Sequence, residues 1–413
     1  MATRIRCAAD RRWAQRVSGA MVDQRALNVL LVDPSLFTAP YDAALTEGLL
    51  AAGVEPMWAT RPTRHADRQE LPIERTDPFF YRHVDEATWL PTRLKPMAKG
   101  VAHLVGLITL LIKIRTRRPD AVHVQWVVVP PLDVLAMALI RRWCPLVLTV
   151  HDTVAFNGQK LSWLQRFGHD GPTRFAHRVI VHTRAGRQAL IDRGVPADKI
   201  AVIPHGALRL SVAAPVAALP RDPRWTFVLF GEIKPYKGLD VLIEAMAALP
   251  VAIRGRARVV VAGRVRMDIA PLVARITELG LQEQFDLRPQ RQSEEDMAVL
   301  FGQADSFVFP YRQIDASGVY FLVKALGKWL IASRVGIFAE DIVDGVDGQL
   351  VPGGDVAALA AALGKAIVER PRRALEPLAD SWTGIGQATR ALYQQAIVES
   401  GAPLRLRDPR IAG

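Results

Sequence analysis

Short apolar runs alternate with longer helical stretches along this chain, and that alternation restricts the fold more than any other feature. Leu27–Asp33 (LNVLLVD) has the near-continuous aliphatic pattern of a strand buried on both faces, and a helical pattern follows over Tyr41–Ala52. Such strands, separated by helices, are typical of a parallel sheet covered by helices on both sides. Further strands are expected at Ala121–Val129, Leu146–His151, Val179–His182 and Ile200–Ile203, with helices over Leu132–Trp143 and Ala185–Arg193.

The alternation stops at residues 207–224, which carry three prolines and no sustained period and therefore predict a linker. It then restarts, with strands expected at Thr226–Phe230, Val259–Ala262, Phe285–Leu287, Ser306–Pro310 and Leu330–Ser333 and helices over Leu239–Ala248 and Ala270–Leu279 and from Glu294 and Gly318. Ser293 and Asp296 have the spacing of a capping box at the start of one of these helices. The prediction is an α/β chain of two doubly wound, Rossmann-like domains, 25–206 and 225–380, facing a cleft.

The net charge and the cysteine count indicate which kinds of partner and compartment suit this chain. Lys and Arg outnumber Asp and Glu by 53 to 41, and a net charge of +12 favours anionic partners such as phosphates, nucleic acid or an acidic membrane surface. The two cysteines, Cys7 and Cys144, exclude a disulfide scaffold and suit a reducing compartment. Residues 1–24 predict a basic tail, with an amphipathic membrane-seeking helix as the alternative, and they lack the apolar core of a secretory signal.

The most apolar stretch, Val101–Ile114, is too short to span a bilayer and has basic residues on both sides. One interpretation is a buried helix that packs on a sheet. The other is a helix that dips into an anionic leaflet while its basic ends bind head groups. Both hold if one face packs inward and the other meets lipid.

Gly231–Gly238 (GEIKPYKG) follows an expected strand and precedes an expected helix. Gly231, Lys234 and Lys237 therefore lie at the carboxyl end of a strand, where two ammonium groups and free backbone N–H groups suit a diphosphate. A solvated basic loop is the alternative.

A second segment, FPYRQIDASGVYFLVK at 309–324, combines a strand end, a polar loop and a helix start. Ser317 is placed as the N-cap, and Gly318 and Val319 begin a helix whose N–H groups would face the cleft. The small side chains let a ligand approach the backbone closely. A capped helix without a ligand is the alternative.

His151 and Asp152 follow the expected strand LVLTV, so that the histidine could donate a hydrogen bond to a substrate or have a structural role. His205, after strand KIAVIP, is either part of an inter-domain turn or in contact with the ligand. Asp152, His205 and Tyr311 are weaker candidates to line the cleft.

Several motifs are missing from the sequence. There is no G-x-G-x-x-G after the first strand, no P-loop, no Asp-x-Asp and no G-x-S-x-G. These absences argue against a dinucleotide-binding fingerprint, a P-loop NTPase, a metal-bridged sugar-nucleotide site and a nucleophile elbow.

Six segments together resemble the retaining GT-B glycosyltransferases of family 4 ("group 1"), most closely those of bacterial exopolysaccharide synthesis. They are VLTVHD at 147–152, VIVHT at 179–183, VIPHG at 202–206, LFGEIKPYKGLDVLIEA at 229–245, VVVAG at 259–263 and FPYRQIDASGVYFLVKALGKWLIASRVG at 309–336. Each is weakly specific alone, but their order and spacing are distinctive over roughly residues 26–400.

The resemblance implies a metal-independent transfer from a nucleotide diphosphate sugar, without a cofactor and with retention of configuration. The first domain would hold the acceptor and the second the donor, and a last helix over 381–400 would cross back to the first domain. Lys237 matches the lysine on the diphosphate, and His151 matches a histidine near the reacting sugar. Ser317, Gly318 and Val319 match the helix start that meets the donor.

The chain departs from the family pattern in two places. Glu232 stands where the phosphate-binding arginine is usual, and Lys234 is expected to supply the charge instead. The family's glutamate pair is not intact: Asp315 or Ile314 takes the first position, and Leu322 or Val323 takes the second, which normally holds the ribose. We expect Asp315 to orient the sugar hydroxyls.

The resulting hypothesis is a transferase that acts on a lipid-linked saccharide, in the cytoplasm and peripheral on the inner face of the plasma membrane. The alternatives are a GT-B transferase with a soluble acceptor and an inactive scaffold that binds sugar nucleotide. A nucleic-acid binder rests on net charge alone and ranks last.

Overall fold

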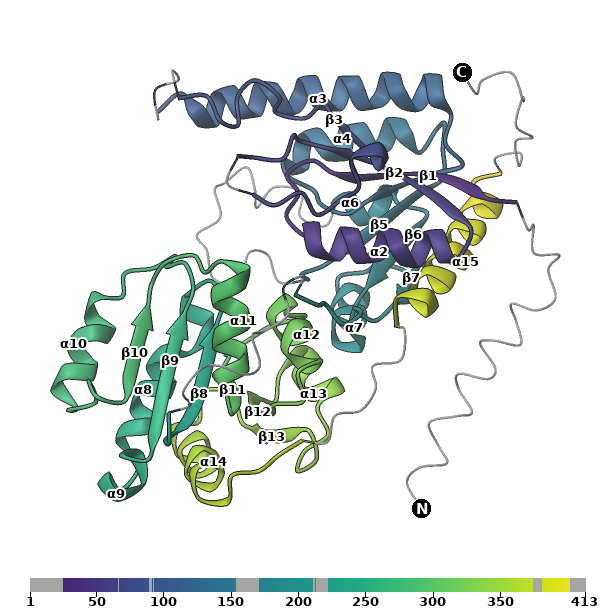
Figure 1. The fold of residues 1–413 in the computed structure, drawn as a ribbon. Coiled ribbons are helices and arrows are strands. Elements are labelled where there is room, and N and C mark those ends of the chain that lie inside the picture. Colours follow the sequence, from purple (N-terminus) through teal and green to yellow (C-terminus); the bar gives the residue numbers. More distant parts are fainter. Residues whose placement is uncertain are drawn as a thin grey trace, which may run out of the picture. The chain divides into compact units, whose positions relative to one another are not determined.

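The computed structural model describes residues 25–65, 67–88, 91, 93–153, 171–210, 212, 222–373 and 381–401 (Figure 1). The chain forms two compact units. The first comprises Met1–Thr149, Phe167–Ile180 and Trp382–Gly413, and the second comprises Val150–Arg166 and Val181–Ser381. The predicted basic tail and most of the predicted linker lie outside the described residues.

One sheet has the order β3-β2-β1-β4-β5-β6-β7, and its strands from β1 to β5 pair in parallel. The strands are β1 (Leu27–Asp33), β2 (Val54–Thr60), β3 (Thr76–Pro78), β4 (Ala121–Val124), β5 (Leu146–Val150), β6 (Arg178–Val181) and β7 (Ile200–Val202). The unit boundary runs through the end of β6, so β7 is counted with the second unit. The order reverses between β1 and β4, as in doubly wound sheets.

The strand expected over Ala121–Val129 ends at Val124 instead. The Asp133 carboxylate accepts hydrogen bonds from the N–H groups of Val128 and Val129, at 2.9 and 2.6 Å. These bonds turn the chain out of the sheet and into the next helix, so the apolar run does not continue as a strand.

The helices of the first unit are α2 (Ala39–Ala51), α3 (Lys95–Arg117), α4 (Pro130–Ile140), α6 (Gly171–Phe175) and α15 (Ser381–Ser400). α7 (Arg184–Asp192) follows β6 and, like β7, is counted with the second unit. α15 belongs to the first unit and touches α2 backbone to backbone, because Gly48 and Gly386 leave room. A Cβ atom on Gly48 would lie 2.2 Å from the carbonyl oxygen of Trp382. The Tyr393 hydroxyl also lies 2.7 Å from Nδ1 of the buried His123.

α3 is longer than the apolar run on which it was predicted. Within the described ranges it is the helix that is long and apolar enough to cross a membrane by length and composition, so the prediction that it is too short was wrong. Its inward residues, among them His103, Leu107 and Leu110, are buried in the first unit.

The second sheet is entirely parallel, in the order β10-β9-β8-β11-β12-β13. Its strands are β8 (Trp225–Phe230), β9 (Ala257–Ala262), β10 (Phe285–Arg288), β11 (Ser306–Phe309), β12 (Trp329–Ser333) and β13 (Gly348–Val351). The helices are α8 (Leu239–Ala247), α9 (Val251–Arg254), α10 (Ala270–Glu278), α11 (Glu294–Gln303), α12 (Gly318–Lys324), α13 (Gly336–Asp341) and α14 (Val356–Glu369).

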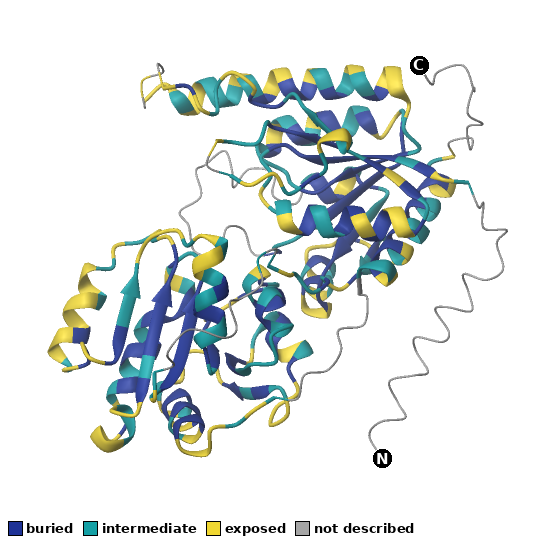
Figure 2. Cartoon of the chain, viewed as in Figure 1, coloured by how far each residue is buried: buried dark blue, intermediate teal, exposed yellow. Residues whose placement is uncertain are grey.

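Apolar cores cover both faces of this sheet, and all its strands except the edge strand β10 are buried along most of their length (Figure 2). One core packs α8 and α14 against the strands, and the other packs α11, α12 and α13. The predicted capping box is confirmed, since Ser293 and Asp296 exchange side-chain and backbone hydrogen bonds at the start of α11. The chain therefore has the predicted architecture of two parallel α/β sheets.

Candidate functional site

The two glycine-containing segments singled out in the sequence leave neighbouring strands of the second sheet. Gly231–Gly238 follows β8, and Pro310–Ser317 follows β11. The strand order reverses between β8 and β11, and ligands of open α/β sheets bind outside the carboxyl ends of strands at such a point. The topology therefore brings both segments to the place where this fold binds ligands.

The first segment is a tight loop with two residues in the left-handed region, Gly231 at φ 100° and Gly238 at φ 70°. A short 3-10 turn, Pro235–Lys237, joins them. A Cβ atom on Gly238 would lie 2.0 Å from the carbonyl oxygen of Pro310, so the loop lies directly against the second segment.

Lys237 points into the protein and is only 4% exposed. Its Nζ donates a hydrogen bond to the carbonyl of Phe230 at 3.0 Å and lies 5.3 Å from the centre of the Tyr311 ring. Burial, and then the charge of Lys234, lowers the pKa of Lys237 to about 7. This environment differs from the solvated basic loop that was the alternative.

Gly231 is the point at which the two segments meet. A Cβ atom there would lie 2.7 Å from Nζ of Lys237 and 2.9 Å from Cγ2 of Val319. A lysine ammonium and the start of α12 therefore converge beside bare backbone, which is the arrangement expected for a diphosphate.

Lys234 was expected to supply positive charge to a diphosphate, but in the structure it is paired with a carboxylate. Its Nζ lies 3.0 Å from Glu232, and the same carboxylate accepts a hydrogen bond from Nε of Arg266 at 2.8 Å. Burial acts to raise the pKa of Glu232, but the bonds from Lys234 and Arg266 outweigh it and lower that pKa. Arg266 was missed by the sequence analysis, although its place just after β9 is a signal that could have identified it.

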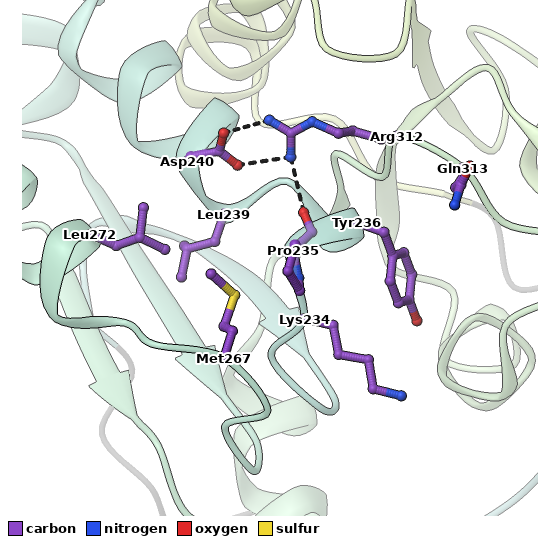
Figure 3. Close-up of a pocket in the computed structure, with 9 residues that line it drawn as sticks. All are labelled: Lys234, Pro235, Tyr236, Leu239, Asp240, Met267, Leu272, Arg312 and Gln313. Carbon is purple, nitrogen blue, oxygen red and sulfur yellow. Dashed lines mark hydrogen bonds and ion pairs between the residues drawn. The ribbon is translucent and has the colours of Figure 1, made fainter. Parts of the chain in front are cut away.

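A pocket of about 540 Å³ opens beside this loop (Figure 3). Leu239, Met267 and Leu272 form its apolar side, and Lys234 is the predicted site residue that lines it. Arg312 holds Asp240 through both guanidinium ends and donates to the Pro235 carbonyl at 3.0 Å, as Figure 3 shows. Arg312 and Asp240 therefore hold the loop at Pro235.

At the second segment, Ser317 caps α12 as predicted, accepting a hydrogen bond from the N–H of Tyr320 at 3.3 Å. A Cβ atom on Gly318 would meet nothing within 4 Å, so the backbone there is open. Tyr311 is fully buried against Tyr236 instead of lining an open surface, and burial raises its pKa. Lys324, next to the missing second glutamate, binds Asp341 at 2.5 Å.

Asp315 is held by Thr153, whose hydroxyl donates to its carboxylate at 2.6 Å and whose backbone N–H donates to the same oxygen. Both residues belong to the second unit, which includes the chain just after β5. The carboxylate is therefore fixed close to the segment that carries His151 and Asp152. Burial raises the pKa of Tyr236, in the loop Gly231–Gly238, and the charge of Asp152 raises it further.

Three histidines of the second unit lie in a row, with the ring centroid of His182 5.0 Å from that of His151 and 5.5 Å from that of His205. Nδ1 of His182 donates to the carbonyl of Ile203 at 3.0 Å, and Nε2 lies 3.1 Å from Nδ1 of His151. Burial lowers the pKa of His182 to about 4, so that its Nε2 is unprotonated near pH 7 and accepts from His151. His182 lies in the segment VIVHT at 179–183, but it was not singled out as a site candidate.

His205 is a packed side chain. Its ring stacks on Phe321 of α12 with centroids 4.0 Å apart, and Nδ1 donates to the Gly206 carbonyl at 2.6 Å. Burial, and then His182, lowers its pKa to about 3. Of the two alternatives for His205, this geometry favours a structural turn.

Comparison with known proteins adds independent findings. A family model described as glycosyl transferases group 1 matches residues 216–376, and one described as glycosyltransferase family 4 matches residues 43–207. A D-inositol 3-phosphate glycosyltransferase of Mycobacterium sp. (strain KMS) is 31% identical over 335 residues, which cover 74% of this chain and 71% of that protein. One of Mycobacterium marinum is 30% identical over 406 residues, with coverages of 87% and 82%.

Solved structures share the fold at low identity. Anabaena Alr3699/HepE in complex with UDP and glucose matches with a TM-score of 0.59 and 17% identity, covering 91% of this chain and 97% of that one. Sucrose-phosphate synthase from Thermosynechococcus elongatus matches with a TM-score of 0.61 and 19% identity, with the same coverages.

Proposed function

Because the chain belongs to the group 1 glycosyltransferases, a family of transferases with the GT-B fold, we propose that it transfers a sugar from a nucleotide diphosphate donor to a lipid-linked saccharide. The product would be part of an exopolysaccharide or another cell-surface glycan. The transfer retains the anomeric configuration, needs no metal ion or cofactor and takes place at the cytoplasmic face of the plasma membrane.

The convergence at Gly231 carries this proposal. With the donor diphosphate beside Gly231, the ammonium of Lys237 and the start of α12, whose backbone is open at Gly318, would both lie next to it. The negative charge of the diphosphate favours the protonated form of Lys237 and so restores the charge that burial disfavours. These groups supply the positive potential that the departing phosphate requires.

In the proposed step, the bond between C1 of the sugar and the phosphate oxygen breaks, and a bond from the acceptor hydroxyl oxygen to C1 forms on the same face. The hydroxyl proton passes to the departing phosphate oxygen, so charge and atoms balance. His151 contacts the sugar, with its orientation set by His182, and Asp315, held by Thr153, orients the sugar hydroxyls.

A soluble, phosphorylated acceptor is the second candidate, and two observations favour it. The relatives compared above are named for D-inositol 3-phosphate. In the first unit, Arg64 and Lys99 bind Asp85 at 2.6 and 2.9 Å, and Arg61 lies 3.6 Å from it, just after β2. Arg61 is 5% exposed and pairs more closely with Asp67, at 2.8 Å, so Arg64 and Lys99, which are 41% and 43% exposed and share Asp85, are the cations that an acceptor phosphate would contact.

A transfer assay with two acceptor classes distinguishes these candidates. Radiolabelled donor sugars are incubated with either lipid-linked saccharides in detergent or soluble inositol and sugar phosphates, using the wild type and Lys237→Ala. The proposal predicts label in the lipid fraction, lost in Lys237→Ala. Label only in the soluble phosphate product, lost on Arg64→Ala, would establish the second candidate and reject the first.

A further inference from the structure

Exposed residues recur along α3 (Figure 2), and those on its outer face are apolar from Met97 to Ile112. Six side chains on it are between 43% and 67% exposed: Met97, Val101, Leu104, Val105, Ile108 and Ile112. At helical spacing they occupy one arc of about 100°. We name these six residues the α3 stripe. Large apolar side chains scattered singly are ordinary on a surface, but a continuous stripe indicates a binding surface.

The opposite face of α3 fixes the helix in the fold. His103 is fully buried, with Nδ1 2.6 Å from the Tyr81 hydroxyl and Nε2 2.9 Å from the Asp133 carboxylate. Gly106 packs directly on Phe80, since a Cβ atom there would lie 2.3 Å from the ring. Rolling the helix to hide the stripe, or extracting it to span a bilayer, would break these buried contacts.

The two ends of α3 are basic, and no acidic residue lies between Lys95 and Arg117. At the carboxyl end, Asp77 pairs with both Lys113 and Arg117, at 2.7 and 2.8 Å, and Arg118 follows directly. At the amino end, Lys95 begins the helix, Lys99 and Arg64 share Asp85, and Arg61 pairs with Asp67 at 2.8 Å while lying 3.6 Å from Asp85. Cations therefore outnumber carboxylates at both ends of the stripe.

We propose that the α3 stripe inserts into the interface of a membrane that contains anionic lipids, with the helix lying in the membrane plane. The apolar side chains would enter the boundary between head groups and acyl chains, while the basic ends contact phosphate head groups. Charge argues against a second copy as the occupant. Pairing two α3 helices in either direction would place one basic end beside another.

This inference deepens the proposed function by naming the surface that brings the enzyme to a lipid-linked acceptor. It rests on α3 alone, however, and its test requires no transfer. If the stripe binds lipid and no lipid-linked saccharide is glycosylated, the proposed acceptor is wrong and the docking surface stands. If the enzyme glycosylates a lipid-linked acceptor in detergent but does not bind vesicles, the proposed acceptor stands and the docking surface is wrong.

The test is flotation of the full chain with vesicles of phosphatidylcholine alone or mixed with phosphatidylglycerol. Val101→Glu/Ile108→Glu adds two charges to the stripe. The matched control, Val251→Glu/Val398→Glu, adds the same two charges at other exposed valines, which are 71% and 78% exposed. A second, uncharged stripe variant, Val101→Ser/Ile108→Ser, tests the same surface if the acidic variant does not fold.

The expected result is binding of the wild type and the control to anionic vesicles, weakened by salt and by removal of phosphatidylglycerol. Both stripe variants should lose about tenfold or more of that binding, with an unchanged melting temperature. The proposal is overturned if the wild type stays unbound or if the folded stripe variants bind equally well. It is also overturned if the stripe variants convert a dimer into monomers while vesicle binding is absent.

Discussion

The ammonium group of Lys237 donates a hydrogen bond to the carbonyl oxygen of Phe230, 3.0 Å away, and both lie inside the second unit. Lys237 is thus held inward, beside Gly231, with a pKa lowered to about 7 by burial and by Lys234. An anionic donor bound at Gly231 would favour its protonated form. Three of the predictions below follow from this relationship.

Donor binding should take up a proton near neutral pH. Above pH 7, free Lys237 is mostly neutral, and the diphosphate must recharge it. The affinity for a nucleotide diphosphate sugar should therefore weaken as pH rises from 7 to 9, by up to about tenfold per unit. Calorimetry in buffers of different ionisation enthalpy measures the proton uptake. Equal affinity at pH 7 and 9 would contradict this role.

Lys237→Met should stabilise the fold while abolishing donor binding. The pKa of Lys237 lies below its ordinary 10.5 in the folded chain, so between pH 7 and 10.5 the unfolded chain binds more protons. The free energy of unfolding of the wild type therefore rises with pH across that window. Below pH 7 the full cost of burying the protonated Lys237 is present. We expect the variant to be more stable at pH 6, on the order of a few kcal/mol, with the difference shrinking towards pH 10. Denaturant melts at both pH values measure it, and a less stable variant at pH 6 would be inconsistent with a buried cation.

Gly231→Ala should damage the site through contact as well as strain. A methyl group there would lie 2.7 Å from Nζ of Lys237 and 2.9 Å from Val319, at a φ of +100°. We expect a loss on the order of 2 kcal/mol in stability and of most donor affinity. Gly194→Ala is the matched control, because Gly194 has φ +85° and nothing within 4 Å of its Cβ position. If both variants bind donor equally, the close approach at Gly231 has no role.

His182 should act as a positioning residue for His151. Because His182 Nε2 accepts from His151 Nδ1, it fixes the tautomer and orientation of the His151 ring. His182→Phe should lower kcat by about tenfold or more with little change in the donor KM. His182→Gln, whose side-chain oxygen can accept the same proton, should recover part of the loss. Equal kcat in the Phe and Gln variants would indicate a purely structural histidine.

The fold was predictable where strands are apolar throughout. The bounds of β1, Leu27–Asp33, were predicted correctly because five of its seven residues are aliphatic, and the start of β8 was predicted to within one residue. β2 was missed because Glu55 and Pro56 interrupt its pattern, and β13 because GQLV is short. Both segments form strands because they pair with neighbouring strands of their sheets, and the local sequence pattern does not indicate this pairing.

The candidate site was predictable only in its location. Strand ends place Gly231–Gly238 and Ser317 correctly, because the carboxyl ends of parallel strands share one edge. The inward turn of Lys237 and the pairing of Glu232 with Arg266 depend on contacts far apart in the sequence. The hydrogen bond of His182 to His151 likewise joins two different strand ends.

The most direct test of the donor site is a thermal-shift titration with UDP-, GDP-, ADP- and dTDP-sugars, without added metal, on the wild type and on Lys237→Met. We expect a saturable rise in melting temperature with one nucleotide class in the wild type and none in the variant. A rise of equal size in Lys237→Met would place the diphosphate elsewhere. A flat response of the folded wild type to every donor would contradict the donor site itself.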